Sequence, residues 1–165
     1  MPKIAVVLVA FSAALATPLA ATAQEGHVVN PATAKFDVVP NIPACFKAAV
    51  VHGDPGAGPS VLLVRSAARC RVPRHWHTPN EELMVVSGTA RVGMKDQAAE
   101  TLRPGGFAYV PSKHQHDFAC AAACSFFVVS DAPFDIHYLD EAGGEIPMDQ
   151  ALKAKAAPTA APKMP

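Results

Sequence analysis

Short β-prone runs separated by glycine and proline dominate the chain and constrain its fold more than any other feature. Between Phe46 and Asp140, segments rich in Val, Leu, Phe and Thr alternate with turn residues, and helical periodicity is scarce. Many short strands at near-regular spacing are typical of an all-β sandwich or barrel. We therefore predict an all-β fold with strand-like runs at 46–53, 60–67, 69–77, 81–88, 89–95, 107–112, 114–120, 124–131 and 134–140.

Residues 1–23 have the pattern of a secretory signal peptide. Lys3 forms a short basic region, residues 4–16 are apolar, and residues 21–23 (Ala-Thr-Ala) have the small-x-small form of a cleavage site. The alternative is an uncleaved N-terminal anchor, although the apolar run is too short to span a bilayer comfortably. Cleavage after Ala23 would give a protein that begins at Gln24, is periplasmic or secreted, and has no further contact with the membrane.

The rest of the chain divides into three parts by composition. Residues 24–44 are an N-terminal lead-in segment, and residues 45–148 contain the strand-like runs, enough for one domain with one core. Residues 149–165 consist largely of Ala, Lys and Pro, with almost nothing to bury, and predict a disordered tail.

The charge balance narrows the choice of partners. Net charge is zero, with 14 basic and 14 acidic residues, and there is no basic stripe interleaved with aromatic residues. Nucleic acid and anionic membrane surfaces are therefore poor candidates. The composition favours a small-molecule ligand or substrate, or another protein that contacts an apolar face.

Four cysteines are present, and an exported chain would carry them into an oxidising compartment, where disulfides form. Three pairings are possible. Cys120 and Cys124 lie between two strand-like runs, and a short hairpin would bring them face to face, which favours Cys120–Cys124 and leaves Cys45–Cys70. Free buried thiols are the alternative. No two pairs have zinc-finger spacing, so we expect no zinc site made of cysteines.

The stretch "HWHTPNEELMVVSG" contains the first candidate metal ligands. His75 and His77 are two residues apart, and in an extended strand they point to the same face, with Trp76 on the other. Imidazole is the side chain that most often binds metals, although a single His-x-His pair is weak support for a site. After a turn, Glu81 and Glu82 begin a strand on opposite faces, so only one of the two carboxylates can point inward with the histidines.

The stretch "GGFAYVPSKHQHDF" contains a third imidazole. A glycine turn at 105–106 enters a strand, Pro111 ends it, and His116 lies on the next extended segment. An inward-facing His116 would complete a set of three histidines and one glutamate. Such a set suits Fe, Mn, Zn, Ni or Cu and leaves coordination positions open for a substrate or water.

The spacing of these residues resembles the two conserved motifs of the cupin superfamily, over about residues 46–140. Gly88 follows the glutamate after six residues in the first motif, and Pro111 lies between Gly105 and His116 in the second. The segments "VVHGDPGAGPSVLLV", "SGTARVGMK" and "PFDIHYLD" are more narrowly similar to small, exported, single-domain bacterial cupins. The seven matching positions are His75, His77, Glu81, Gly88, Gly105, Pro111 and His116.

The resemblance implies a double-stranded β-helix, the RmlC-like jelly-roll barrel of type-2 cupins. One divalent metal ion would lie in its mouth, held by His75, His77, Glu81 and His116. The family spacing selects Glu81 over Glu82 as the ligand.

Three positions depart from the family pattern. The glycine expected before the first histidine is Arg69, the glycine expected after the proline is Lys113, and the asparagine that often ends the second motif is Cys120. None of the three is a ligand position. The departures concern the turns rather than the ligands, and Lys113 would place a cation at the rim of the site.

The resemblance leaves the reaction open. A metal-dependent enzyme of dioxygenase, lyase or isomerase type on a small organic substrate is one hypothesis, in which Glu81 also serves as a catalytic proton carrier. A non-catalytic binding or sensing module with a structural metal or small ligand is the alternative, and a structural protein whose histidines bind nothing is a third. Cupins commonly pair through their sheets, so an exposed face with Met84 and Val86 would allow a homodimer.

The remaining polar candidates have simpler explanations. We expect His114 to support the site or lie at the surface, and Asp117 to be solvated because it is out of phase with His116. Tyr109 either lines the pocket or lies in the core with a bonded hydroxyl. We expect His52 at a turn and His27 in an unstructured start, while His137 could line the pocket or pack on the surface.

Overall fold

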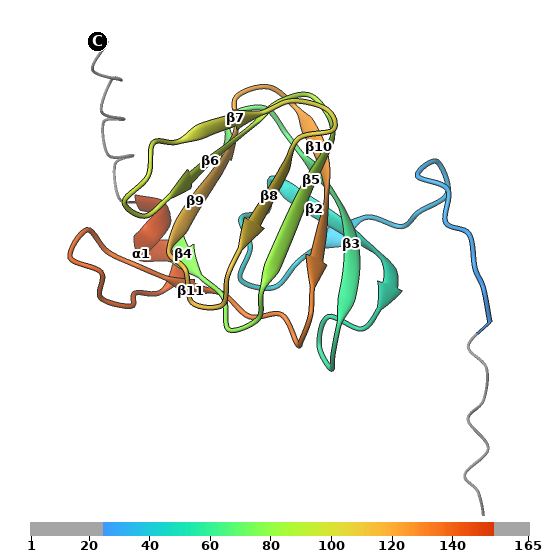
Figure 1. The fold of residues 1–165 in the computed structure, drawn as a ribbon, viewed down its shortest axis with the longest axis horizontal. Helices are drawn as coiled ribbons and strands as arrows, with labels where there is room; N and C mark the ends of the chain where they lie inside the picture. The colour runs from blue at the N-terminus through green and yellow to red at the C-terminus, as the bar shows by residue number, and fades with distance from the viewer. Residues whose placement is uncertain (1–24, 154–165) are drawn as a thin grey trace, which may run out of the picture.

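The computed structural model describes residues 25–153, and it folds into two antiparallel sheets that face each other (Figure 1). The six-stranded sheet has the order β1-β2-β3-β10-β5-β8, and the five-stranded sheet has the order β11-β4-β9-β6-β7. The predicted all-β fold is confirmed, and the two facing sheets form a jelly-roll barrel. The elements are β1 (Asp37–Val38), β2 (Phe46–Gly53), β3 (Ser60–Ser66), β4 (Cys70–Trp76), β5 (Glu81–Ser87), β6 (Ala90–Met94), β7 (Glu100–Leu102), β8 (Phe107–Val110), β9 (His116–Cys120), β10 (Cys124–Ser130), β11 (His137–Tyr138) and α1 (Met148–Lys153).

The core lies between the sheets because the strands alternate in polarity. In β10 every second residue is buried, from Cys124 to Ser130, since successive side chains of a strand point to opposite faces. Three phenylalanines meet at the centre, where the ring of Phe118 lies 4.5 Å from Phe126 and 6.1 Å from Phe46. Such ring pairs add to the free energy gained by burying apolar surface.

Two disulfides fasten the end of the barrel at which β4 begins and β9 ends. Cys45 is bonded to Cys70, and Cys120 to Cys124, so the predicted pairing is confirmed and the described residues contain no free cysteine. Cys70 and Cys120 are cross-strand partners of β4 and β9, so the two bridges lie side by side. Both strands run from this end to the other end of the barrel, where the candidate ligands lie.

Two of the predicted segments differ from those in the structure. The lead-in segment contributes β1, which pairs with β2. Residues 149–153, which we assigned to the tail, belong to α1, and Ala151 is buried in the core. The tail was placed too early because a short helix that buries a single alanine has no recognisable apolar stripe. The predicted signal peptide and residues 154–165 lie outside the described residues.

Within residues 25–153, no helix has the length and apolar character needed to cross a bilayer.

The turns keep left-handed backbone geometry even where the expected glycine is missing. Gly88 has φ 71°, and a Cβ atom there would lie 2.4 Å from the carbonyl oxygen of Ala123, so only glycine fits. Arg69 has φ 59° and Lys113 has φ 60°, values uncommon for residues with a side chain. Both departures from the family pattern therefore occupy the conformation that glycine would adopt.

Candidate metal centre

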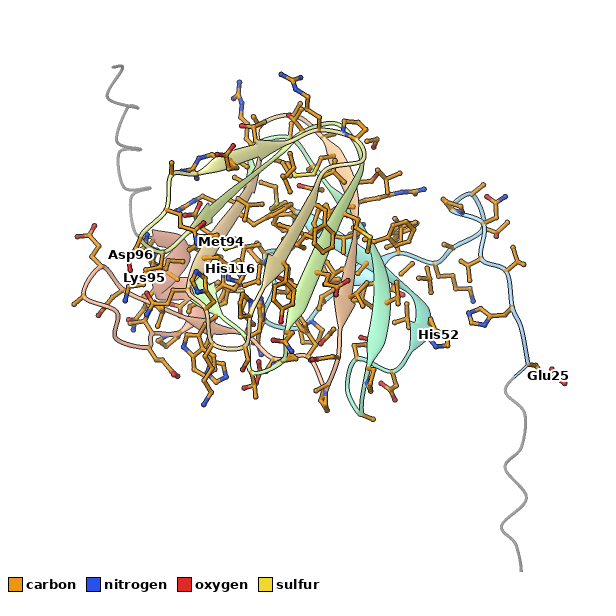
Figure 2. The ribbon with its side chains drawn as sticks, viewed as in Figure 1. Glu25, His52, Met94, Lys95, Asp96 and His116 are labelled. Atoms are coloured by element: carbon orange, nitrogen blue, oxygen red, sulfur yellow. A yellow bond between two sulfur atoms is a disulfide. The ribbon has the colours of Figure 1, made fainter. Side chains whose placement is uncertain are left out.

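Four buried polar side chains meet inside one end of the barrel. His75 lies near the end of β4, His77 follows that strand, Glu81 opens β5 and His116 opens β9. Their exposed fractions are 3%, 3%, 6% and 1%. Figure 2 shows His116 on the barrel, well away from His52 on the opposite side of the molecule. The structure thus brings together the four residues that sequence spacing selected.

A shift of register in β4 turns the histidines inward. Cys70 and Val72 are buried, so strict alternation would bury residue 74 and expose residue 75. Instead the pairing of β4 with β9 is interrupted between Val72 and His75, and Arg74 is exposed while His75 is buried. Pro73 lies in the interruption, where a residue without an N–H group is tolerated. The shift moves His75 and His77 to the inner face of the barrel.

Backbone carbonyl groups fix the orientation of all three imidazole rings. Nδ1 of His75 donates to the carbonyl of Pro73 at 2.6 Å, and Nδ1 of His116 donates to that of His114 at 3.1 Å. Nδ1 of His77 donates to the carbonyl of Asp135. Because Nδ1 carries the proton in each ring, each Nε2 has a free lone pair when the ring is neutral. This is the arrangement that orients histidine ligands around metals.

The donor atoms are close enough to share one ion. One ring nitrogen from each of His75, His77 and His116 lies within 4.8 Å of the other two. Oε2 of Glu81 lies 3.2 Å from Nε2 of His116, and Oε1 lies 3.7 Å from Nε2 of His77. Nε2 of His77 and Oε2 of Glu81 are buried without a hydrogen-bond partner. Buried polar atoms nearly always have a hydrogen-bond partner, so the two atoms without one fit the role of metal ligands.

The protonation states also suit metal binding. Burial lowers the pKa of His75 well below 6.5, and the nearby His116 and His77 lower it further. Burial lowers the pKa of His77 as well, although Glu81 opposes this. For Glu81, burial acts to raise the pKa, but His77 and His116 outweigh it and hold the pKa below 4.5. At neutral pH the site therefore offers neutral imidazoles at His75 and His77 and an ionised carboxylate at Glu81, the forms that bind metals.

The cavity at these four side chains is otherwise apolar. It measures about 60 Å³, and every other residue that lines it is aliphatic or aromatic, including Phe46, Phe118 and Phe126. Such walls keep water away from the donors and strengthen electrostatic interactions within the site.

A loop after β10 completes the site, and sequence reasoning missed it. The ring of Phe134 lies 4.7 Å from that of His77, the carbonyl of Asp135 accepts the proton of that histidine, and Ile136 lines the cavity. This loop is 58 residues from His77, and a backbone carbonyl leaves no trace in the residue type. The only available signal was the similarity of "PFDIHYLD" to exported cupins.

Two other histidines lie outside the cavity. His114 supports the site through its backbone carbonyl, as expected of a supporting residue, and its side chain does not line the cavity. The open choice for His137 is settled in favour of packing outside the cavity. Its ring stacks on Trp76 at 3.8 Å, and it contacts Asp135 and Glu145 at 3.4 and 3.2 Å.

Four other polar residues differ in how well they match expectation. Tyr109 is 50% exposed rather than in the core or the pocket, because it faces outward on the edge strand β8, although its hydroxyl does donate to Asn80. Asp117 is out of phase with the buried His116 and partly exposed, as expected, and it also forms a 2.7 Å ion pair with Arg91 on the neighbouring strand. His27 lies in a segment without helix or strand, as expected, although its ring donates to the carbonyl of Val51 and stacks on His52. His52 is the penultimate residue of β2 rather than a turn residue.

Comparison with known proteins places this geometry in context. The profile of the cupin domain matches residues 62–130. The polyketide cyclase RemF from Streptomyces resistomycificus is similar with a TM-score of 0.60 and 20% identity, over 71% of this chain and 89% of that one. No curated protein sequence matches the chain.

Two further solved structures have the same fold. For an RmlC-like cupin from Shewanella frigidimarina the TM-score is 0.55 at 15% identity, over 66% of this chain and 92% of that one. For the DMSP lyase DddQ from Ruegeria pomeroyi it is 0.52 at 20% identity, over 61% of this chain and 57% of that one. At such identities the likeness establishes a common fold, whereas the reaction depends on the site.

Proposed function

We propose that this chain, which belongs to the cupin superfamily, is a metal-dependent enzyme that acts on a small organic substrate. One divalent transition-metal ion would be held by His75, His77, Glu81 and His116. The observation that carries the proposal is the convergence of three imidazole nitrogens within 4.8 Å beside a buried carboxylate. The orphaned Nε2 of His77 and Oε2 of Glu81 fit such an ion.

The donor set is compatible with several transition-metal ions, namely Fe, Mn, Zn, Ni and Cu. When bound, such an ion supplies Lewis acidity and open positions for a substrate, and iron would also supply reactivity toward O₂. Dioxygenase, lyase and isomerase reactions could each use a metal ion with these properties.

The residues of this chain have distinct tasks in the proposed reaction. His75, His77 and His116 orient the substrate indirectly, because the backbone carbonyls hold their rings in one position. Glu81 is the only carboxylate among the described residues that line the cavity, and at neutral pH it is ionised and able to accept a proton. We assign Glu81 a catalytic role for this reason. The apolar walls exclude water from the reacting atoms.

One experiment tests both the metal and the glutamate. Protein purified natively, without a histidine tag, is expected to contain about one transition-metal ion per chain by elemental analysis. The metal-loaded protein is then assayed on a panel of small carbonyl, hydroxy and enol compounds. Glu81→Ala should lose turnover at least about a hundredfold, while Glu82→Ala, its outward-facing neighbour, should keep it. Equal turnover in Glu81→Ala and in the native protein would reject the catalytic role of Glu81.

A non-catalytic binding module is the second candidate. It is favoured by the absence of any acid or base in the cavity lining, within the described residues, other than the four candidate ligands. A protein of this kind would hold zinc tightly, with no exchangeable water and no turnover on the panel.

The disulfides bear on where the protein works. Two disulfides indicate an oxidising environment, because they rarely persist in the cytosol. Together with the pattern of residues 1–23, this supports export to the periplasm or the medium. N-terminal sequencing of the protein from its native host should begin at Gln24, and an intact Met1 would contradict export by cleavage.

A homodimer through the outer face of β5 and β8 is part of the proposal. Val86, Phe107 and Tyr109 are 48%, 53% and 50% exposed on these neighbouring strands, and Met84 is half-buried opposite Phe107. Apolar side chains gathered on one sheet face often mark an interface. Light scattering should give the mass of two chains, and a monomeric mass would exclude the dimer.

A further inference from the structure

The lining of the inner cavity restricts what it can bind. Apart from the four candidate ligands, it contains no hydrogen-bonding or charged side chain. A charged or strongly polar group on a bound molecule would find no partner there unless it faced the metal, and an unpaired buried charge is very unfavourable. A ligand of this site therefore has its polar atoms at one end.

The inner cavity is also too small for most organic molecules. Its volume of about 60 Å³ corresponds to about four water molecules. A second hollow of about 540 Å³ lies beside it, between the N-terminal segment and β2. This hollow, the outer groove, is lined by apolar residues such as Val38, Pro40, Val50 and Pro55, with Lys35 and Asp37 also in its lining.

The inner cavity and the outer groove share a wall. Val39, Ala48, Leu62 and Phe134 line both. Phe134 also contacts the ring of His77, so it stands between the donor set and the outer groove. Its backbone N–H is held by the carbonyl of Pro55 at 2.8 Å. With the backbone held there, a rotation of the half-buried phenyl ring would be the movement that joins the two spaces.

We propose that the inner cavity and the outer groove form one binding site for an elongated molecule with a chelating pair of oxygens at one end and an uncharged hydrocarbon body. The oxygens face the donor set, and the body passes Phe134 to lie against Val38 and Val50. This inference rests on the proposed metal site and names the class of molecule that the site takes. A polar group at the far end of the molecule reaches solvent at the rim, near Lys35 and Asp37.

Alkyl hydroxamates test the proposal, because the hydroxamate group chelates metals through two oxygens and the chain length can be varied. Titration calorimetry of the full, metal-loaded protein should show affinity rising about fourfold per added methylene group, and at least a hundredfold from acetohydroxamate to octanohydroxamate. Succinohydroxamate, whose carboxylate would lie in the inner cavity, should bind at least tenfold more weakly than butanohydroxamate. Equal affinity for the short and long chains would overturn the proposal and leave the metal site intact.

Variants in the shared wall locate the hydrocarbon body. Ala48→Phe should reduce the advantage of octanohydroxamate over acetohydroxamate at least tenfold, because the added ring closes the passage. Lys47→Phe, its exposed neighbour in β2, should leave both affinities unchanged. If Ala48→Phe does not fold, Val50→Asp at a half-exposed position should weaken octanohydroxamate at least tenfold more than acetohydroxamate. Unchanged ratios in the variants that fold would overturn the proposal.

A metal-independent measurement separates this proposal from the proposed function. If the protein takes up no metal, the proposed function fails, and the outer groove is tested alone with the uncharged fluorescent probe N-phenyl-1-naphthylamine. Metal-free native protein should enhance the fluorescence of the probe, and Val50→Asp should lower the affinity at least fivefold. Equal binding by both proteins would overturn the assignment of the outer groove.

Discussion

His75 and His116 are directly opposite each other on β4 and β9, and the centroids of their rings lie 4.0 Å apart. The two imidazoles are therefore held in contact by the pairing of two neighbouring strands. A site preorganised in this way would bind an ion without first ordering the chain, which favours affinity.

We predict that His116→Ala weakens the binding of Zn²⁺ by roughly a hundredfold or more, because loss of a residue that merely supports a ligand already costs ten- to a hundredfold. Competition with a chromogenic chelator measures the affinity. His52→Ala removes an exposed histidine far from the site and serves as the control. Equal affinities in the two variants would exclude His116 from the ligand set.

The stability of the metal-free protein should fall as the pH drops below about 6.5. Burial keeps His75 and His77 neutral in the folded state, with pKa values below 6.5, whereas the unfolded chain protonates them near that value. The unfolded state then binds more protons, and each histidine removes up to about 1.4 kcal/mol of stability per pH unit. Glu81, whose folded-state pKa is below 4.5, adds a loss only under more acidic conditions.

Urea unfolding at about pH 7 and about pH 5.5 measures this effect. His75→Gln should reduce the dependence on pH, while His52→Gln should leave it as in the native protein. The prediction concerns how steeply the free energy of unfolding changes with pH. A general loss of stability in either variant therefore does not obscure it. If the stability of His75→Gln depends on pH as steeply as that of the native protein, His75 is not a source of the pH dependence.

The two disulfides should contribute unequally to stability. Cys45–Cys70 closes a loop with a sequence separation of 25, and Cys120–Cys124 one with a separation of 4. From the entropy of loop closure we expect a loss of about 3.5 kcal/mol for the first and about 2 kcal/mol for the second. Urea unfolding of the double variants Cys45→Ala/Cys70→Ala and Cys120→Ala/Cys124→Ala measures the two losses. A larger loss from the second pair would contradict the prediction.

Substitution of two left-handed glycines should have different effects. Gly105 has φ 85° and open space around it, so Gly105→Ala should cost roughly 1 kcal/mol of strain. Gly88→Ala adds a collision of Cβ with the carbonyl of Ala123, and should cost at least about 2 kcal/mol more. Thermal unfolding followed by circular dichroism compares them. Equal shifts in melting temperature would show that the turn at Gly88 adapts.

Sequence reasoning predicted the strands best where alternation is strong. The run at 46–53 coincides with β2, and the alternation of Glu81, Leu83 and Val85 with their neighbours is the burial pattern of β5. The strand β7 was missed because it has three mostly exposed residues, and α1 because its six residues make fewer than two turns. Short elements of this kind form only because the rest of the barrel provides a surface for them.

The inward position of the candidate ligands was predictable, while their surroundings were not. Spacing selected His75, His77, Glu81 and His116, and the structure places all four together. The carbonyl of Asp135 and the ring of Phe134 come from a distant loop, and nothing in the local sequence connects them with His77. Such partners are determined by tertiary packing, which a single sequence does not reveal.

The interruption at Pro73 has a consequence for transplanting this site. Since strand residues alternate between the two faces, a one-residue change of phase exchanges the inside and the outside of the barrel. Without the interruption, Arg74 and Trp76 would occupy the interior, and His75 and His77 would face the solvent with no change in composition. A designer who copied the His-x-His pair into a regular strand would have to copy the irregularity before it, or choose the opposite phase.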